Sequence, residues 1–145
     1  MDSPREIRDG EEFALETLKT YLLENNINAD DLSIKQFPSG YSNLTYFLKS
    51  SSEEFVLRRP PFGAKSLQGG HDMFREYNVL KNLKSQFLKV PDVYLYCDNS
   101  EIIGAPFYLM ERVKGYIIRP NLQQKDSPGK EVIQNVSKSL VSTLV

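Results

Sequence analysis

The sequence predicts an α+β fold, in which one helix packs against a five-stranded antiparallel sheet and a further helix lies at each end. Short β-rich segments follow one another with brief polar connections, and a helical segment interrupts them only once. Such connections favour antiparallel pairing, because parallel strands need a long crossover between them. The five strands are expected at residues 32–37, 45–48, 55–58, 93–97 and 105–113.

Apolar residues at three- and four-residue steps predict the helices. The first helix is expected at 10–25, where Asp9 and Glu12 resemble a capping box. The helix after the third strand is expected at 71–86, with Asp72 as its N-cap. The predicted apolar face of this helix consists of Phe74, Tyr77, Leu80 and Leu83. A last helix is expected to have an apolar face made of Val132, Ile133, Val136, Leu140 and Leu144.

Charge and cysteine content narrow the class of protein. The chain carries 19 acidic and 18 basic residues, so no large net charge attracts it over long range to nucleic acid or to an anionic membrane. Cys97 is the only cysteine, which excludes an intrachain disulfide and a cysteine-rich zinc site. The sequence has no apolar run approaching the roughly 20 residues that span a bilayer, and its first residues lack the apolar core of a signal peptide. We therefore expect a cytoplasmic protein that binds neither nucleic acid nor membranes.

A glycine-containing loop joins the first two expected strands and is a candidate for binding phosphate. Gly40 lets the backbone approach a ligand closely, and the successive amides up to Asn43 can surround phosphate oxygens. Ser42 could add a hydroxyl donor. An ordinary hairpin turn explains the same residues, and it is the more economical interpretation of the loop alone.

The third expected strand ends in a cation, and a glutamate follows in the next helix. Strand alternation places Val56 and Arg58 on one face, where Val56 could cover an adenine while Arg58 reaches phosphates. Glu76 could orient that arginine, as a helix glutamate does in protein kinases. An exposed strand-end arginine and a solvated glutamate are the simpler interpretations of each residue alone. The order of loop, cation, glutamate and a last strand running into Gly115 favours a nucleotide-binding lobe.

These segments together resemble the aminoglycoside phosphotransferase family, and most closely the phosphotransferase-like domain that is fused to some acyl-CoA dehydrogenases. The resemblance covers about residues 31–119 and is carried by residues 36–46, 55–61, 75–77 and 103–115 together with His71. It implies a protein-kinase-like fold, of which this chain holds the N-lobe. It also implies transfer of the γ-phosphate of ATP or GTP to a hydroxyl of a small molecule, with Mg²⁺.

The resemblance also implies roles for individual residues. Arg58 takes the place of the phosphate-binding lysine of the family, and Glu76 would orient it. The Glu111 carbonyl and the Val113 amide would contact the base, and Met110 would line the back of its pocket. Because arginine is planar and bidentate, its phosphate geometry must differ from that of a lysine.

The catalytic motif of the family, H-G-D-x-x-x-x-N, has no counterpart in the sequence. The only histidine, His71, precedes Glu76 and has no asparagine at the required spacing. A lone histidine is also a poor basis for a metal site, which usually needs three or four ligands. We therefore assign no catalytic and no metal-binding residue. We expect a piece of a longer protein that does not transfer phosphate alone.

The expected organisation is a tail and helix (1–30), a nucleotide-binding N-lobe (31–115), and a segment with the hinge, a linker and the start of a C-lobe (116–145). Two other interpretations remain open: a non-catalytic kinase-like module that binds nucleotide or a partner, and a plain α+β interaction domain. The acceptor is not specified, although the dehydrogenase-fused relatives favour a hydroxyacyl compound. The apolar face of the last helix predicts either disorder beyond about Lys125 or self-association of two copies.

Overall fold

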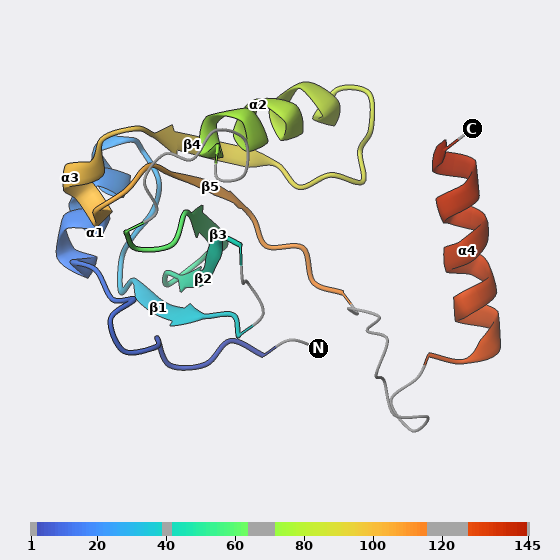
Figure 1. The fold of residues 1–145 in the computed structure, drawn as a ribbon, viewed down its shortest axis with the longest axis horizontal. Helices are drawn as coiled ribbons and strands as arrows, with labels where there is room; N and C mark the ends of the chain where they lie inside the picture. Colours follow the sequence, from blue (N-terminus) through green and yellow to red (C-terminus); the bar gives the residue numbers. More distant parts are fainter. Residues whose placement is uncertain (1–2, 39–41, 64–71, 116–127, 145) are drawn as a thin grey trace. The chain divides into compact units, whose positions relative to one another are not determined.

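A computed structural model describes residues 3–38, 42–63, 72–115 and 128–144 (Figure 1). The chain forms two compact units, 1–115 and 116–145. The first unit confirms the predicted fold class, because its single five-stranded sheet is antiparallel throughout, with the order β1-β2-β3-β5-β4. The strands are β1 (Ser33–Gln36), β2 (Leu44–Lys49), β3 (Glu54–Arg59), β4 (Val93–Cys97) and β5 (Phe107–Glu111).

Strand register determines which side chains share a face of the sheet. Val56 of β3 lies opposite Met110 of β5, and Arg58 lies opposite Tyr108. Side chains of directly paired residues point to the same face, and residues two apart in a strand do so as well. These four residues therefore lie together on one face of the sheet, on two neighbouring strands.

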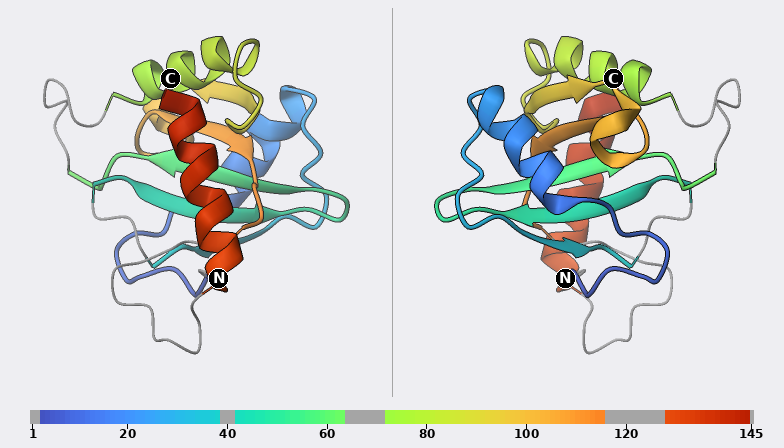
Figure 2. Two further views of the ribbon diagram at one scale, coloured as in Figure 1. Left: turned by 90° about the vertical axis from the view of Figure 1, so that its right-hand side faces the viewer. Right: turned by 90° about the vertical axis from the view of Figure 1, so that its left-hand side faces the viewer.

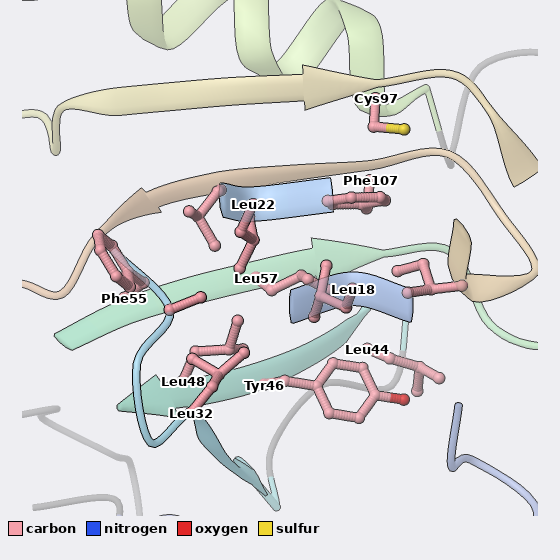
Figure 3. Packing of buried hydrophobic residues seen from close by; sticks show 13 residues of the cluster. Leu18, Leu22, Leu32, Leu44, Tyr46, Leu48, Phe55, Leu57, Cys97 and Phe107 are labelled. Atoms are coloured by element: carbon pink, nitrogen blue, oxygen red, sulfur yellow. The ribbon is translucent and has the colours of Figure 1, made fainter. Parts of the chain in front are cut away.

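The opposite face of the sheet carries the hydrophobic core and is covered by α1 (Leu15–Glu24) (Figure 2). Leu18 and Leu22 of this helix have no exposed surface. Figure 3 shows them beside Leu48 of β2 and Leu57 of β3, which are equally buried. The core thus fixes the position of β3, the strand that carries Arg58 on its other face.

The start of the first helix differs from the prediction. The helix begins at Leu15 rather than at residue 10, and Ala14 in the N-cap position makes no side-chain capping bond, so the predicted capping box is wrong. Long-range contacts hold the preceding segment away from helical geometry. The backbone of Arg5 exchanges two hydrogen bonds of 2.8 Å with Gln36, and Gly10 has a positive φ of 79°. Tertiary pairing with β1 therefore overrides the local helix signal.

The central helix, α2 (Met73–Lys84), packs against β4 and β5 and confirms its predicted cap. The Asp72 carboxylate accepts a hydrogen bond of 2.9 Å from the Arg75 amide. Its predicted apolar face is wrong in part: Tyr77 and Leu80 are half-buried as expected, but Phe74 and Leu83 are 54% and 42% exposed, although the Phe74 ring lies 5.1 Å from the Tyr96 ring of β4. The helix instead turns toward the sheet a stripe that consists of the buried Met73 and the half-buried Glu76, Tyr77, Leu80 and Lys84. Two charged residues, Glu76 and Lys84, therefore lie on the side of α2 that faces the sheet.

A short helix, α3 (Ser100–Ile103), lies between β4 and β5, where the sequence was not expected to form a helix. The Asn99 side chain caps it by accepting a hydrogen bond of 2.9 Å from the Glu101 amide. Gly104 ends it with a φ of 81°, the left-handed conformation that favours glycine. The capping residues at both ends are the signal that the sequence interpretation missed.

The predicted last helix is confirmed as α4 (Lys130–Leu144) in the second unit. Its formation contradicts the alternative of disorder for residues 130–144. Five of its apolar side chains are 43–61% exposed, namely Val132, Ile133, Val136, Leu140 and Val141. Self-association through this helix stays a prediction. Among the described residues, no helix is long and apolar enough to cross a membrane.

Tyr46 makes stability depend on pH. Its buried hydroxyl donates a hydrogen bond of 2.7 Å to the Glu11 carbonyl, and burial raises the pKa of Tyr46 from 10.0 to about 12. Because the folded state favours the neutral phenol, this contribution is complete below pH 10 and is lost as the pH rises toward 12. We expect the free energy of unfolding to fall by about 1 kcal/mol from this group between about pH 9 and pH 11. Urea unfolding of the wild type and Tyr46→Phe at both pH values measures it, and an equal fall in both proteins would contradict the assignment.

Candidate functional site

Arg58 and Glu76 form an ion pair on the face of the sheet opposite α1. Arg58 comes from the end of β3, and its Nη1 lies 3.4 Å from Oε2 of Glu76 in α2. The two side chains are 32% and 27% exposed. Ion pairs with this degree of solvent contact contribute only about 0–1 kcal/mol to stability. The pair therefore orients the Arg58 guanidinium and contributes little to the stability of the fold.

Two neutral donors share the Glu76 carboxylate with Arg58. The Asn43 amide donates to Oε1 at 2.8 Å, and the Tyr108 hydroxyl donates to Oε2 at 3.0 Å. Asn43 directly precedes β2, and Tyr108 lies in β5 beside Arg58. Burial and the neighbouring Glu76 carboxylate both raise the pKa of Tyr108, so its hydroxyl stays protonated as a donor. One carboxylate thus joins α2 to the loop before β2, to β3 and to β5.

The Nε atom of Arg58 is buried and has no hydrogen-bond acceptor among the residues that the structure describes. Buried donors in native proteins are nearly always paired, so this atom calls for an explanation. A phosphate oxygen is a well-matched acceptor, because guanidinium groups bind phosphate through parallel N–H donors. The geometry at Arg58 therefore fits a phosphate-bearing ligand.

Ion pairs hold the residues that follow β5, Arg112 to Lys114, against the start of β3. The Glu54 carboxylate, at the start of β3, lies 2.9 Å from Arg112 Nη1 and 2.8 Å from Lys114 Nζ. These contacts lower the pKa of Glu54, and the hydrogen bond from Lys114 has the largest effect. The Arg112 guanidinium also lies over the Phe47 ring, 4.2 Å from its centroid. The chain between these two cations is tied to the β2–β3 hairpin, and it contains Val113, which is 63% exposed.

The side chain of Glu111 is turned toward β4. Its Oε2 accepts a hydrogen bond of 3.1 Å from the Asp92 amide and lies 3.8 Å from Lys84 Nζ. Its own amide donates to the Asp92 carbonyl at 2.8 Å. A contact of Glu111 with a ligand on the Arg58 face would therefore be made by its backbone carbonyl, as the resemblance implies.

The structure brings some of the predicted site residues together. Glu76 contacts both Asn43 and Arg58, and Val56 and Met110 share the face of Arg58. Other predicted positions stand apart from this contact. Ser42 is exposed next to Asn43, whereas Gly40 lies outside the described residues, as does His71.

Tyr108 is the member of this contact cluster that sequence reasoning missed. It contacts the Glu76 carboxylate directly, yet the sequence pattern predicts it only as part of the last strand. Its signal was strand alternation, because Tyr108 lies two residues before Met110 on the same face. Within the described ranges, no group of three or more His, Cys, Asp or Glu side chains could hold a metal ion.

Comparison with known proteins gives the family. Residues 33–137 match the phosphotransferase enzyme family. Acyl-CoA dehydrogenase family member 11 of Rattus norvegicus is 38% identical over 144 residues, which is 96% of this chain but 18% of the rat protein. Acyl-CoA dehydrogenase family member 10 of Mus musculus is 33% identical over 132 residues, or 89% of this chain and 12% of the mouse protein.

A solved structure is also similar to this chain. It is a crystal structure from Ralstonia eutropha that is assigned to the aminoglycoside phosphotransferases, with a TM-score of 0.62 and 30% sequence identity. The match covers 77% of this chain and 32% of the solved chain. It confirms the predicted kinase-like fold. Sequence and structure thus agree that this chain belongs to the phosphotransferase enzyme family, and that it is related to the corresponding region of acyl-CoA dehydrogenase family members 10 and 11.

Proposed function

We propose that this chain is the ATP-binding lobe of a phosphotransferase whose complete form transfers the γ-phosphate of ATP to a hydroxyl of a small molecule. The observation that supports it most strongly is the arginine at the end of β3. The Arg58 guanidinium is oriented by Glu76 and keeps a buried Nε–H without an acceptor among the described residues. Such a donor suits the phosphates of a nucleotide, and the family generally carries out ATP-dependent phosphate transfer.

Each residue around Arg58 has a role in this proposal. Val56 and Met110 would contact the adenine from the sheet side, and Arg58 would bind the phosphates. The Glu111 carbonyl and the Val113 amide would bond the edge of the base. Positioning and charge stabilisation account for most of the catalysis of phosphate transfer, so a binding lobe contributes directly to the reaction. In this proposal, Mg²⁺ would be held in the complete protein together with the phosphates of the nucleotide.

Thermal unfolding of this chain with added ligands tests the proposal. MgATP should raise the midpoint of unfolding, and the shift should grow as its concentration rises above Kd. A ligand that binds only the folded state stabilises it by RT ln(1 + [L]/Kd). Adenosine and inorganic tripolyphosphate, added separately, report on the base and the phosphates. Tripolyphosphate should stabilise the wild type but not the Arg58→Met variant. A midpoint unchanged by saturating MgATP would contradict the proposal and favour a plain interaction domain.

A further inference from the structure

Glu76 is held more closely by neutral groups than by Arg58. The Asn43 amide and the Tyr108 hydroxyl lie 2.8 and 3.0 Å from the carboxylate oxygens, whereas Arg58 Nη1 lies at 3.4 Å. Asn43 is 4% exposed and Tyr108 has no exposed surface, while Glu76 keeps 27% of its side chain in solvent. The direction of the carboxylate is therefore set by two buried donors.

The two donors come from parts of the lobe that flank Arg58. Asn43 ends the loop between β1 and β2, and Tyr108 lies opposite Arg58 on the neighbouring strand. A loop-to-helix bond and a sheet-to-helix bond thus converge on one carboxylate. A partly exposed ion pair alone would leave two long side chains free to move. Buried hydrogen bonds that restrict the orienting group are the usual means of fixing such a pair.

We infer that Asn43 and Tyr108 are positioning residues that hold Glu76 so that the Arg58 guanidinium faces the phosphates of the bound nucleotide. Through Asn43, the start of β2 is also linked to α2, so a shift of one changes the carboxylate that orients Arg58. This inference rests on the proposed nucleotide-binding function. It differs from a purely structural role, in which the two donors only satisfy the carboxylate. In that case their loss would affect all ligands alike.

Calorimetric titration with MgATP and with adenosine tests the role of Tyr108. Tyr108→Phe removes one hydroxyl from a buried ring, and we expect it to weaken MgATP binding about fivefold to tenfold, the effect of one typical hydrogen bond. Adenosine binding should stay unchanged. Tyr94→Phe is the matched control, because it removes a hydroxyl from a ring that is 48% exposed on β4, and both affinities should stay unchanged. Equal weakening of both ligands by Tyr108→Phe, or no weakening, would overturn the inference.

A second variant tests Asn43. Asn43→Asp keeps the size of the side chain but places a carboxylate beside Glu76, so MgATP binding should weaken more than in Tyr108→Phe, and adenosine binding should not. Asn82→Asp adds the same charge at an exposed position of α2 and should change neither affinity. If Asn43→Asp binds MgATP as the wild type does, the inference fails.

A double-mutant cycle separates positioning from an independent contact. If Tyr108 acts through Glu76, Tyr108→Phe should cause no further loss of MgATP affinity in a Glu76→Gln background. A fully additive loss would contradict that route. Failure of the wild type itself to bind MgATP would contradict the proposed function, whereas normal wild-type binding with unaffected variants contradicts only the inference about Asn43 and Tyr108.

Discussion

The Arg58→Met variant is expected to bind MgATP about 10- to 100-fold more weakly than the wild type, because it loses a charge-assisted hydrogen-bonding group worth roughly 1.5–3 kcal/mol. Methionine retains an unbranched apolar stem and removes the guanidinium. Adenosine has no phosphate, and its affinity should stay within about twofold of the wild-type value. Calorimetric titration of both ligands, in the same buffer at fixed ionic strength, gives the comparison.

Two further variants separate charge from geometry. Lys81→Met removes the same charge from the exposed side of α2, and its affinity for MgATP should match the wild type. Arg58→Lys keeps the charge but loses the planar, bidentate donor set, so its affinity should fall between those of Arg58→Met and the wild type. Loss of MgATP binding in Lys81→Met would show that overall charge, rather than the site, controls the affinity. Unchanged binding in Arg58→Met would remove Arg58 from the site.

Much of the fold could be predicted because its strands carry strong local signals. The β2–β3 hairpin and the two later strands were expected to within a few residues, since short apolar segments bounded by polar turns specify antiparallel pairing. The errors arose where tertiary contacts decide. The chain before α1 pairs with β1 instead of extending the helix, and Leu83 of α2 is exposed although its spacing placed it on the apolar face. The apolar periodicity of a single segment predicts neither the pairing of the chain before α1 nor the orientation of α2.

The candidate site could be predicted in part, because the order of motifs along the chain indicates which residue types belong together. Arg58 and Glu76 were paired on that basis, and the structure places them in contact. The bonds from Asn43 and Tyr108 to Glu76 were not expected. They depend on the register of β3 with β5 and on the rotation of α2, both of which emerge only from the assembled lobe.

Two adjacent arginines at the end of β3 point to opposite faces of the sheet, because successive residues of a strand alternate between its faces. Arg58 points to the Glu76 side, whereas Arg59 is 1% exposed. Arg59 donates to the Ile103 carbonyl at 2.6 Å and lies over the Phe62 ring, 3.7 Å from its centroid. Arg59 therefore links the end of β3 to the last residue of α3. The strand that carries Arg58 is held in place by the next residue along the chain.

The position of β3 also depends on Leu57, and Leu57→Ala should lower the free energy of unfolding by about 2–5 kcal/mol. Leu57 has no exposed surface, and its strand lies between β2 and β5 rather than at an edge of the sheet. Truncation removes buried methyl groups and leaves a cavity against α1 that a central strand cannot collapse to fill. Chemical denaturation monitored by circular dichroism measures the change, and a fitted slope equal to that of the wild type would attribute it to stability alone.

Leu88→Ala is the matched control, because it makes the same truncation at a side chain that is 80% exposed, and its effect should stay within about 0.5 kcal/mol. The two variants make the same truncation at a buried strand position and at an exposed turn position, so the difference between them reports chiefly the contribution of the core. Under conditions where Leu57→Ala is still mostly folded, it should bind MgATP nearly as well as the wild type, since its side chain points away from Arg58. A loss below about 1 kcal/mol in Leu57→Ala would show that the core on the α1 face does not fix β3.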